Sequence, residues 1–391
     1  MRQRAYSRLS FQVLSAILKI VKLTAKVKLD TTAEQFSALT DTLKRANRCC
    51  DWISGQAWKA NTFGQYAIHK LAYHAAKKRF SLSAQVVVRA IAKVADAYKL
   101  DNKIKRTFHP TGSIAYDDRI LKWYVDQKMV SIWATAGRLK ISFVGGDRQL
   151  ALLRSRQGEA DLILHGGAFY LAAVCTIAEP DPSDVGEFLG IDLGVAQIAA
   201  DSDGTIYSGS AVKSVRHRHR RLRAKLQSCQ TPSAKRRLKK LSGKESRFAR
   251  DVNHCISKQI VENAKRTERG LAIEDLTYIR ERIRARRRQR AVLHSWAFAQ
   301  LRAFLEYKAA LAGVPLFIVD PRNSSRECSA CGHTDKRNRP NQSTFRCLAC
   351  GHAEHADTNA ARVISGRAAV NPPNVASCAV VSHDSVTSRR L

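Results

Sequence analysis

The sequence predicts a β-barrel with a helical insert, followed by an α/β domain. The barrel prediction depends on a strand pattern at 20–30, which helical periodicity separates from a β-rich region at 112–178. The α/β prediction depends on the alternation of strand and helix patterns after residue 184. Short alternating runs between glycine turns are typical of antiparallel barrels, whereas alternation with helices is typical of βαβ units. The length of 391 residues allows several domains with buried cores.

The barrel pattern begins at Ile20, from which apolar and basic residues alternate as far as Asp30. Thr31-Thr-Ala-Glu34 matches a capping box and predicts the start of a helix. Helical periodicity then continues, with breaks, to about Leu100. Strand patterns return at 131–134, 139–143 and 169–174. The predicted divisions are an N-terminal extension at 1–20, a wedge-like barrel at 21–30 and 101–184, and a helical insert at 31–100.

The α/β pattern follows a predicted linker at 179–184, which is rich in proline and aspartate. Its elements are a buried strand at 188–193, a hairpin at 197–207, a basic helical stretch at 212–262 interrupted near Thr231-Pro232, a strand at 271–276, a helix at 293–312 and a strand at 316–319. The α/β domain is therefore predicted at 185–321 and 353–365, with a cysteine-rich insert at 322–352 and a disordered tail at 366–391.

The charge of the chain predicts a polyanionic partner. Lys and Arg number 67 against 33 Asp and Glu, which gives a net charge of +34. Such an excess repels itself in an isolated globule and most often accompanies nucleic-acid binding. A protein with merely solvated basic faces seldom reaches a pI of 10.2. No apolar run reaches the roughly 20 residues that a membrane span requires, so no membrane partner is expected.

Two Cys-x2-Cys pairs near the C-terminus predict a zinc site, with the ligands Cys328, Cys331, Cys347 and Cys350. Tetrahedral zinc binds thiolates at about 2.3 Å, and each pair can present two of them. A glycine after each pair lets the backbone bend around the metal. Because four thiolates fill the coordination shell, this zinc is predicted to be structural. Redox-active cysteine pairs are the alternative.

Three acidic residues lie where a carboxylate is costly unless it binds a metal or a partner. Asp192 and Glu274 interrupt apolar strands, and Asp357 opens a helical run. In so basic a chain, three such carboxylates predict a centre for two Mg²⁺ ions that hydrolyses phosphodiesters, with Asp192 bridging the ions. Asp275 is expected on the opposite face of its strand. Asn359 is predicted to orient Asp357 or the scissile phosphate. Individually, these acids also fit a hydrogen-bonded turn residue or a helix N-cap.

Dense basic runs predict contacts with phosphate groups, which carry no sequence information. The candidate residues are Arg216, Arg218, Arg220, Arg221, Arg286, Arg287 and Arg288. The predicted N-terminal helices also contain four aromatic residues, Trp52, Trp58, Tyr66 and Tyr73. We expect these aromatic side chains to belong to the core of the helical insert, with base stacking as the alternative.

The chain resembles the TnpB family, RNA-guided endonucleases of bacterial and archaeal insertion sequences that are related to type V CRISPR effectors. The family's three RuvC motifs match Gly190-Ile-Asp-Leu-Gly194, Ile273-Glu-Asp-Leu276 and Asp357-Thr-Asn-Ala-Ala361. Its zinc ribbon matches the cysteine pairs. The likeness extends through Asp320-Pro-Arg-Asn-Ser-Ser-Arg-Glu-Cys, Gly158-Glu-Ala-Asp-Leu and the segment from Ser81. Residues 21–365 are covered.

The resemblance implies a RuvC (RNase H-like) nuclease domain with an inserted zinc ribbon, behind a wedge barrel that carries a helical recognition insert. It also implies a guide RNA from the transposon end, a double-stranded DNA target and Mg²⁺. Gln85 lies on the segment that matches a helix facing the target-adjacent motif in the family, so the resemblance implies that Gln85 contacts DNA. A prokaryotic cytoplasmic, nucleoid-associated location follows, whereas the oligomeric state is left open.

Three other functions compete with this prediction. A nuclease-inactive, RNA-guided DNA-binding regulator is disfavoured because all three carboxylates are present. An RNase H-fold transposase acting without guide RNA usually lacks a zinc ribbon just before its last acid. An actin-like ATPase could use Asp192-Leu-Gly194 at a phosphate loop, but neither the cysteine pairs nor the charge fits that class.

Overall fold

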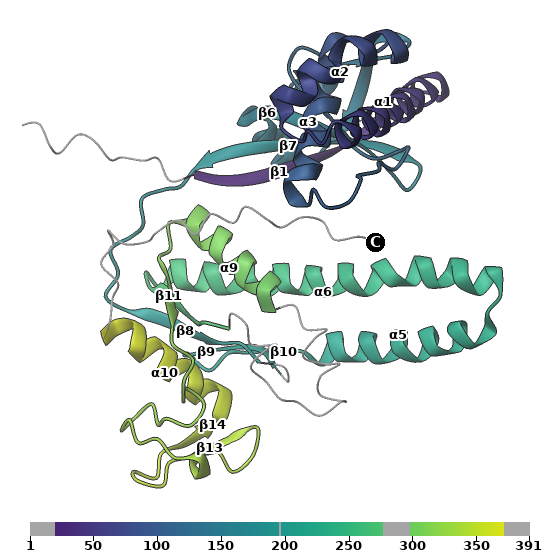
Figure 1. Ribbon diagram of the computed structural model, residues 1–391. Helices are drawn as coiled ribbons and strands as arrows, with labels where there is room; N and C mark the ends of the chain where they lie inside the picture. Colours follow the sequence, from purple (N-terminus) through teal and green to yellow (C-terminus); the bar gives the residue numbers. More distant parts are fainter. Residues whose placement is uncertain (1–19, 195–196, 277–297, 371–391) are drawn as a thin grey trace, which may run out of the picture. The chain divides into compact units, whose positions relative to one another are not determined.

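The computed structural model describes residues 20–194, 197–276 and 298–370. The chain divides into two compact units, residues 1–178 and 179–391 (Figure 1). Nearly all of the predicted N-terminal extension lies outside the described residues, as do Arg286, Arg287 and Arg288. Within the described part of the chain, no helix has the length and apolar character needed to cross a membrane.

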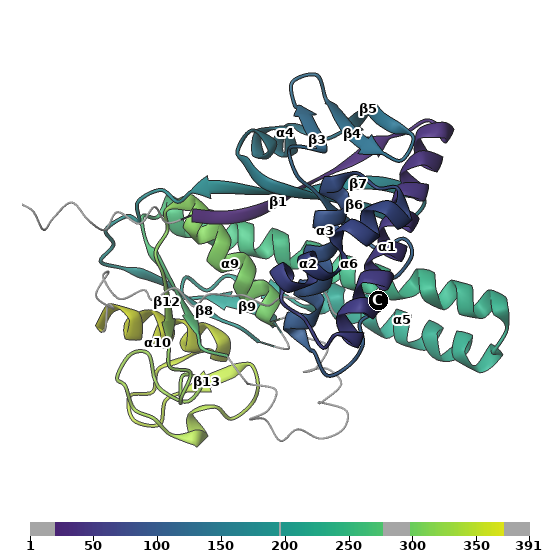
Figure 2. The ribbon, with the colours of Figure 1, turned by 45° about the horizontal axis from the view of Figure 1, so that its top comes forward.

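The first unit is built on an antiparallel sheet in the order β2-β6-β7-β1-β5-β4-β3. Its strands are β1 (Ile20–Asp30), β2 (Ile114–Tyr116), β3 (Leu121–Tyr124), β4 (Met129–Ala134), β5 (Gly137–Val144), β6 (Arg156–His165) and β7 (Ala168–Ala178), with α4 (Asp147–Arg154) between β5 and β6. Figure 2 shows this sheet from a second direction.

The predicted barrel is a nearly closed sheet. Closure is incomplete, because its two edge strands do not pair with each other. These edges, β2 and β3, are consecutive along the chain, and neither forms a ladder with the other among the described residues. The Tyr116 hydroxyl at the end of β2 donates to the Trp133 carbonyl in β4 at 3.1 Å. A side-chain hydrogen bond therefore crosses the seam that backbone pairing leaves open.

Three helices, α1 (Ala33–Lys59), α2 (Gln65–Phe80) and α3 (Ala84–Leu100), form the insert between β1 and β2. The capping box of α1 lies one residue later than predicted: Thr32 is the N-cap, and its hydroxyl accepts from the Gln35 N–H at 3.2 Å. Gln35 Oε1 accepts in return from the Thr32 N–H at 3.1 Å. Glutamine at the third helical position completes the box as well as glutamate would.

The expected core role of the four aromatic residues is correct for two of them. Trp52 and Tyr73 pack against the hydrophobic core, and Trp58 is 38% exposed. Tyr66 is 86% exposed at the start of α2, so its assignment to the core was wrong. Helical periodicity places a residue on a face, but near a helix end that face need not have a partner.

The second unit contains a five-stranded sheet in the order β10-β9-β8-β11-β12. The strands are β8 (Phe188–Asp192), β9 (Gln197–Asp201), β10 (Ile206–Ser208), β11 (Gly270–Glu274) and β12 (Leu316–Val319). β8 pairs antiparallel with β9 and parallel with β11, which in turn pairs parallel with β12. The helices are α5 (Ser210–Cys229), α6 (Pro232–Arg266), α9 (Phe298–Ala312) and α10 (Ala356–Val370).

Alternation along β8 assigns the two faces of this sheet. Leu189 and Ile191 belong to a core that includes residues of α6 and α9. Phe188 belongs instead to a cluster with Ile364 and Ala368 of α10. Because successive strand residues point to opposite faces, the α10 face also receives the next even-numbered positions of β8.

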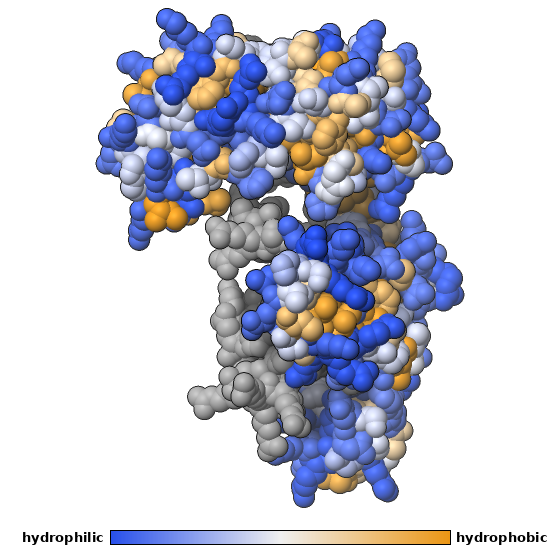
Figure 3. Space-filling model, turned by 90° about the vertical axis from the view of Figure 1, so that its right-hand side faces the viewer, coloured by the Kyte–Doolittle hydropathy of each residue, from blue (hydrophilic) through white to orange (hydrophobic). Residues whose placement is uncertain are grey.

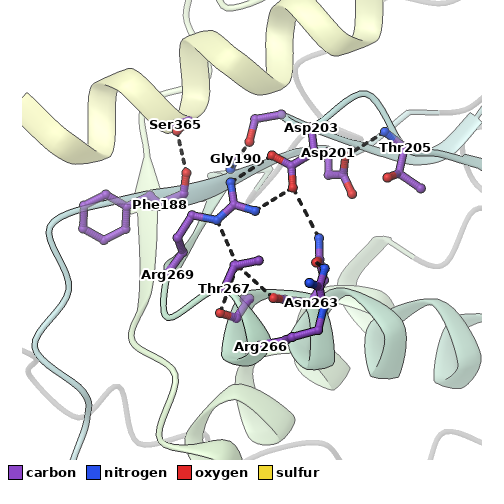
Figure 4. A network of polar contacts seen from close by, with 12 residues as sticks. Phe188, Gly190, Asp201, Asp203, Thr205, Asn263, Arg266, Thr267, Arg269 and Ser365 are labelled. Atoms are coloured by element: carbon purple, nitrogen blue, oxygen red, sulfur yellow. Dashed lines mark hydrogen bonds and ion pairs between the residues drawn. The ribbon is translucent and has the colours of Figure 1, made fainter.

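Helix α10 lies directly against β8. A Cβ on Gly190 would lie 2.0 Å from the Ala361 carbonyl oxygen, so only glycine permits this approach. The Ser365 hydroxyl donates to the Phe188 carbonyl at 2.6 Å (Figure 4). Since α10 continues to Val370 with Ala368 buried, the disordered tail predicted from residue 366 starts at least five residues too early.

A polar network surrounds the turn between β9 and β10 (Figure 4). The Arg269 guanidinium binds both carboxylate oxygens of Asp203, at 2.9 and 2.5 Å. Asn263, in the last turns of α6, also donates to Asp203, at 3.4 Å. The predicted hairpin turn is thereby attached to α6 and to the start of β11.

The basic helical stretch forms a hairpin of α5 and α6, which lie side by side in Figures 1 and 2. It turns where predicted, because the Thr231 hydroxyl caps α6 by accepting from the Ala234 N–H at 3.2 Å and Pro232 occupies the first turn. Hydrophilic side chains dominate the face of the molecule in Figure 3, where apolar ones are scattered.

Candidate active site

The ends of two neighbouring parallel strands bring Asp192 and Glu274 together. Asp192 is the last residue of β8 and Glu274 is the last residue of β11. Ile191 pairs with Ile273, so the next residues of the two strands lie beside each other. Asp192 lies two residues after Gly190, and Glu274 lies two residues after Ala272. Because Gly190 and Ala272 face α10, both carboxylates lie on that same face of the sheet.

Asp357 approaches the same strand ends from α10, where it lies in the first turn and is 8% exposed. Burial, followed by the negative charges of Glu274 and Asp357, raises the pKa of Asp192 well above its usual value. Burial also raises the pKa of Glu274. Clustered buried carboxylates are unstable as ions, and a divalent cation is the usual means of compensating them.

Arg339 forms an ion pair with Asp357 that was not anticipated from the sequence. Its guanidinium donates to Asp357 Oδ1 at 2.8 Å and opposes the rise in the pKa of Asp192. Arg339 lies between the two cysteine pairs, eighteen residues before Asp357 in the chain. One arginine among many in so basic a sequence gives no local signal of this contact.

The spacing of the three carboxylates differs from that of the cysteines. Among the Asp, Glu, His and Cys side chains in the described part of the chain, the four cysteines form a cluster whose ligand atoms all lie within 4.8 Å of one another. Among the described residues, Asp192, Glu274 and Asp357 do not form a group of this kind.

Asp275 and Asn359 have other partners. Asp275 Oδ1 accepts from Arg302 of α9 at 3.0 Å, on the opposite face of the sheet as expected. Asn359 is fully buried, and its amide donates to the Glu327 carbonyl at 2.7 Å and accepts from the Ser329 N–H at 3.0 Å. These described bonds hold the backbone around Cys328, and the role of Asn359 in orienting Asp357 or a phosphate stays a prediction.

The four cysteines fit a structural zinc site. Sγ atoms of Cys328 and Cys350 are 3.7 Å apart, and those of Cys331 and Cys347 are 3.6 Å apart. A tetrahedral ion with bonds of about 2.3 Å requires sulfurs separated by roughly 3.8 Å. The four sulfurs therefore have the mutual spacing of tetrahedral zinc ligands.

The backbone around the cysteines forms two matching turns. The Gly332 N–H donates to the Cys328 carbonyl at 2.9 Å, and the Gly351 N–H donates to the Cys347 carbonyl at 3.1 Å. Both glycines have φ of +74°, the left-handed conformation that glycine adopts without strain. β13 (Thr344–Arg346) and β14 (Ala353–His355) pair behind the second turn.

The predicted nucleic-acid contacts have different environments. Arg218, Arg220 and Arg221 are exposed on α5. Arg216 is partly buried and pairs with Glu245 of α6 at 3.4 Å, so it also ties the hairpin together. Gln85 donates to Asp117 and accepts from Arg119 at 3.2 Å. Their contacts with nucleic acid remain predictions.

Comparisons with known proteins match most of the second unit. Residues 173–280 match a family model described as "Probable transposase" (OrfB_IS605), and residues 298–364 match one described as "Cas12f1-like, TNB domain". A TnpB-like protein of Methanocaldococcus jannaschii is 36% identical over 96 residues, which is 24% of this chain and 34% of that protein. The second unit is thus similar in sequence to TnpB-like proteins.

Two further relatives are named as DNA endonucleases. Cas12f1 of Sulfoacidibacillus thermotolerans, a CRISPR-associated endodeoxyribonuclease, is 34% identical over 129 residues, or 33% of this chain and 29% of that protein. A protein of Escherichia coli K12 named "Putative RNA-guided DNA endonuclease InsQ" is 30% identical over 49% of this chain and 50% of its own length. The chain thus matches between about a third and a half of these relatives' lengths.

The fold is also that of solved effector structures. A Cas12f1–sgRNA–target DNA complex aligns with a TM-score of 0.55 at 16% identity, over 84% of this chain and 82% of Cas12f1. A Cas_phi3 endonuclease aligns with a TM-score of 0.56 at 10% identity, over 90% of this chain and 93% of the other. At such identities the likeness establishes the fold.

Proposed function

We propose that this protein is an RNA-guided, Mg²⁺-dependent DNA endonuclease of the TnpB type. The observation that carries the proposal is the convergence of Asp192, Glu274 and Asp357 at one end and on one face of the sheet. Matches to relatives named as endodeoxyribonucleases support the reaction. The fold shared with an effector bound to sgRNA and target DNA supports the partners.

In this proposal the second unit is a RuvC-like nuclease domain with a zinc ribbon at 322–352. The first unit is a wedge domain with a helical recognition insert at 31–100. The basic α5–α6 hairpin supplies phosphate contacts through Arg218, Arg220 and Arg221, which are exposed. Guide RNA from the transposon end would pair with one strand of the target DNA, so that base pairing supplies the sequence specificity.

Asp192 would bind both metal ions, with Glu274 and Asp357 on opposite sides. Their oxygens suit Mg²⁺, because hard cations prefer carboxylate ligands. Bound Mg²⁺ lowers the pKa of coordinated water and stabilises charge on the phosphate. The carboxylates orient the ions, and burial of Glu274 and Asp357, at 6% and 8% exposure, limits competing solvent.

Arg339 would help to neutralise the centre. Its guanidinium pairs with Asp357 at 2.8 Å. When cations occupy the site, the same guanidinium is close enough to a carboxylate ligand to contact the anionic substrate. Arginine suits this role because it stays charged and can donate two parallel hydrogen bonds to a phosphate.

The deciding experiment is expression with the flanking genomic DNA and sequencing of the RNA that co-purifies. A discrete RNA that ends at the element boundary, followed by Mg²⁺-dependent cutting of a matching DNA, is expected. A discrete RNA with guided binding but no cutting would favour the nuclease-inactive regulator. Random RNA, or none, with DNA strand transfer would favour the unguided transposase.

A further inference from the structure

A buried serine contacts one of the three carboxylates. Ser324 lies in the segment 320–327, which connects β12 to the first cysteine pair, and it is 4% exposed. Its hydroxyl donates to Glu274 Oε1. We propose that Ser324 is a positioning residue that fixes the Glu274 carboxylate for metal binding, an inference that rests on the proposed function.

The hydrogen-bonding capacity of Ser324 favours this role. A serine hydroxyl has one proton, and both Glu274 Oε1 and the Pro321 carbonyl, at 3.1 Å, are within reach as acceptors. An ionised carboxylate is the stronger acceptor. The proton therefore goes to Oε1. Within the described part of the chain no residue donates to Oε2, so the second oxygen is left to bind a cation.

The segment that carries Ser324 is fixed from α10, the helix that carries Asp357. Arg367 donates to the backbone carbonyls of Asp320 at 2.6 Å and Arg322 at 2.8 Å. The same guanidinium pairs with the Glu327 carboxylate at 2.5 Å. One arginine of α10 thus holds this segment before and after Ser324.

The cysteine cluster fixes the far end of the segment. Asn359 of α10 bonds to the backbone on both sides of Cys328, at the Glu327 carbonyl and the Ser329 N–H. Ser324 precedes Cys328 by only four residues. The position of Glu274 relative to Asp357 therefore depends on a short segment that α10 and the cysteine cluster hold together. Neither strand β11 nor the helix alone determines that relationship.

The expected consequence of losing the Ser324 hydroxyl is a weaker metal site in a folded protein. Partners that orient metal ligands typically change metal affinity by about 10- to 100-fold when they are removed. We expect Ser324→Ala to weaken Mn²⁺ binding by that factor, because Glu274 would then rotate freely. Zinc content is expected to remain at one ion per chain.

The test is a Mn²⁺ titration of the full-length, zinc-loaded protein. The electron paramagnetic resonance signal of free Mn²⁺ measures how much of the ion is bound. Ser324→Ala is compared with Ser324→Thr, which keeps the hydroxyl and is expected to restore most of the affinity. Ser325→Ala is the matched control, because Ser325 is the adjacent serine and makes no side-chain hydrogen bond to a described residue. Melting temperature and zinc content are measured on every variant.

Glu274→Gln separates failure of this inference from failure of the proposed function. If Glu274→Gln loses Mn²⁺ binding but Ser324→Ala stays within twofold of wild type, the positioning role is overturned and the metal centre stands. Equal weakening by Ser325→Ala, or no recovery in a Ser324→Thr protein of normal melting temperature, also overturns it. If Glu274→Gln binds Mn²⁺ as wild type does, the metal centre and the proposed function fail together.

Discussion

Gly190 lies so close to Ala361 that an added Cβ would be 2.0 Å from the Ala361 carbonyl oxygen and 2.6 Å from the Ser365 nitrogen. Both obstructing atoms belong to the backbone of α10, so a rotamer change cannot relieve the clash. This contact sets the distance between β8, which ends in Asp192, and the helix that carries Asp357.

Gly190→Ala is therefore expected to displace α10 and separate Asp192 from Asp357. Overpacking of a close contact typically costs about 1–3 kcal/mol, and a backbone clash belongs at the upper end of that range. We expect a lower melting temperature and loss of cleavage. Gly186→Ala is the matched control, because its added Cβ has no described atom within 4 Å. Equal melting temperatures for the two variants would contradict the predicted clash.

Asp192→Asn is expected to stabilise the metal-free protein while abolishing cleavage. The pKa of Asp192 is raised in the folded state by burial and by its acidic neighbours. Between its unfolded and folded pKa values the folded protein binds more protons, so this residue lowers stability as pH rises. The amide cannot ionise and avoids that loss. Melting temperatures of the zinc-loaded protein at pH 5 and pH 8, in chelator-free buffer without added divalent cations, test this.

Wild-type protein is expected to lose more stability than Asp192→Asn between these two pH values. Added Mg²⁺ should raise the melting temperature of wild type, because a ligand that binds only the folded state stabilises it. The variant should gain little. A variant that cuts guided DNA would remove Asp192 from the assigned site, whatever its stability.

Cys347→Ser is expected to release zinc and to disorder the backbone around Cys328. Three remaining thiolates bind zinc more weakly, and Asn359 depends on that backbone for both of its hydrogen bonds. Zinc content by mass spectrometry and the melting temperature are the measurements. Cys229→Ser, at an exposed cysteine outside the cluster, serves as control. One zinc per chain at an unchanged melting temperature in Cys347→Ser would refute the structural role.

Arg339→Ala is expected to lower cleavage more than DNA binding, because its guanidinium lies beside Asp357 rather than on the exposed hairpin. Loss of one charge-assisted contact to the reacting phosphate corresponds to roughly 10²–10³ in rate. Arg339→Lys should recover only part of it, since lysine cannot donate two parallel hydrogen bonds. Single-turnover cleavage at saturating Mg²⁺ separates the rate from metal affinity, and a wild-type rate for Arg339→Ala would exclude this role.

Replacing Arg218, Arg220 and Arg221 together with alanine is expected to weaken nucleic-acid binding without sequence preference. Each phosphate contact contributes about 0.9 to the slope of log affinity against log salt for duplex DNA. The slope should therefore fall by about 2.7 if all three contact phosphates. Lys258→Ala, an exposed lysine of α6 that pairs with Glu262, is the control. An unchanged slope would move the phosphate contacts away from α5.

The sequence by itself determined the elements and the local chemistry of this protein. Strand and helix periodicities, the Thr231-Pro232 break and the Cys-x2-Cys spacing are encoded over a few residues, so β1, the α5–α6 hairpin and the cysteine turns follow from them. Asp192 and Glu274 were equally visible, because a carboxylate that ends an apolar strand is conspicuous without any neighbour.

Only the tertiary structure decided which surfaces meet. The contacts of Arg339 with Asp357, Ser324 with Glu274 and Asn359 with the Cys328 turn each join residues that are many positions apart. Periodicity predicts which face of a helix a side chain lies on but not what packs against that face. Tyr66 is therefore exposed although its pattern suggested the core, and α10 continues beyond the residue at which the tail was predicted to start. Packing between distant segments supplies that missing information, since burial and backbone clashes, as at Gly190, select one arrangement among many.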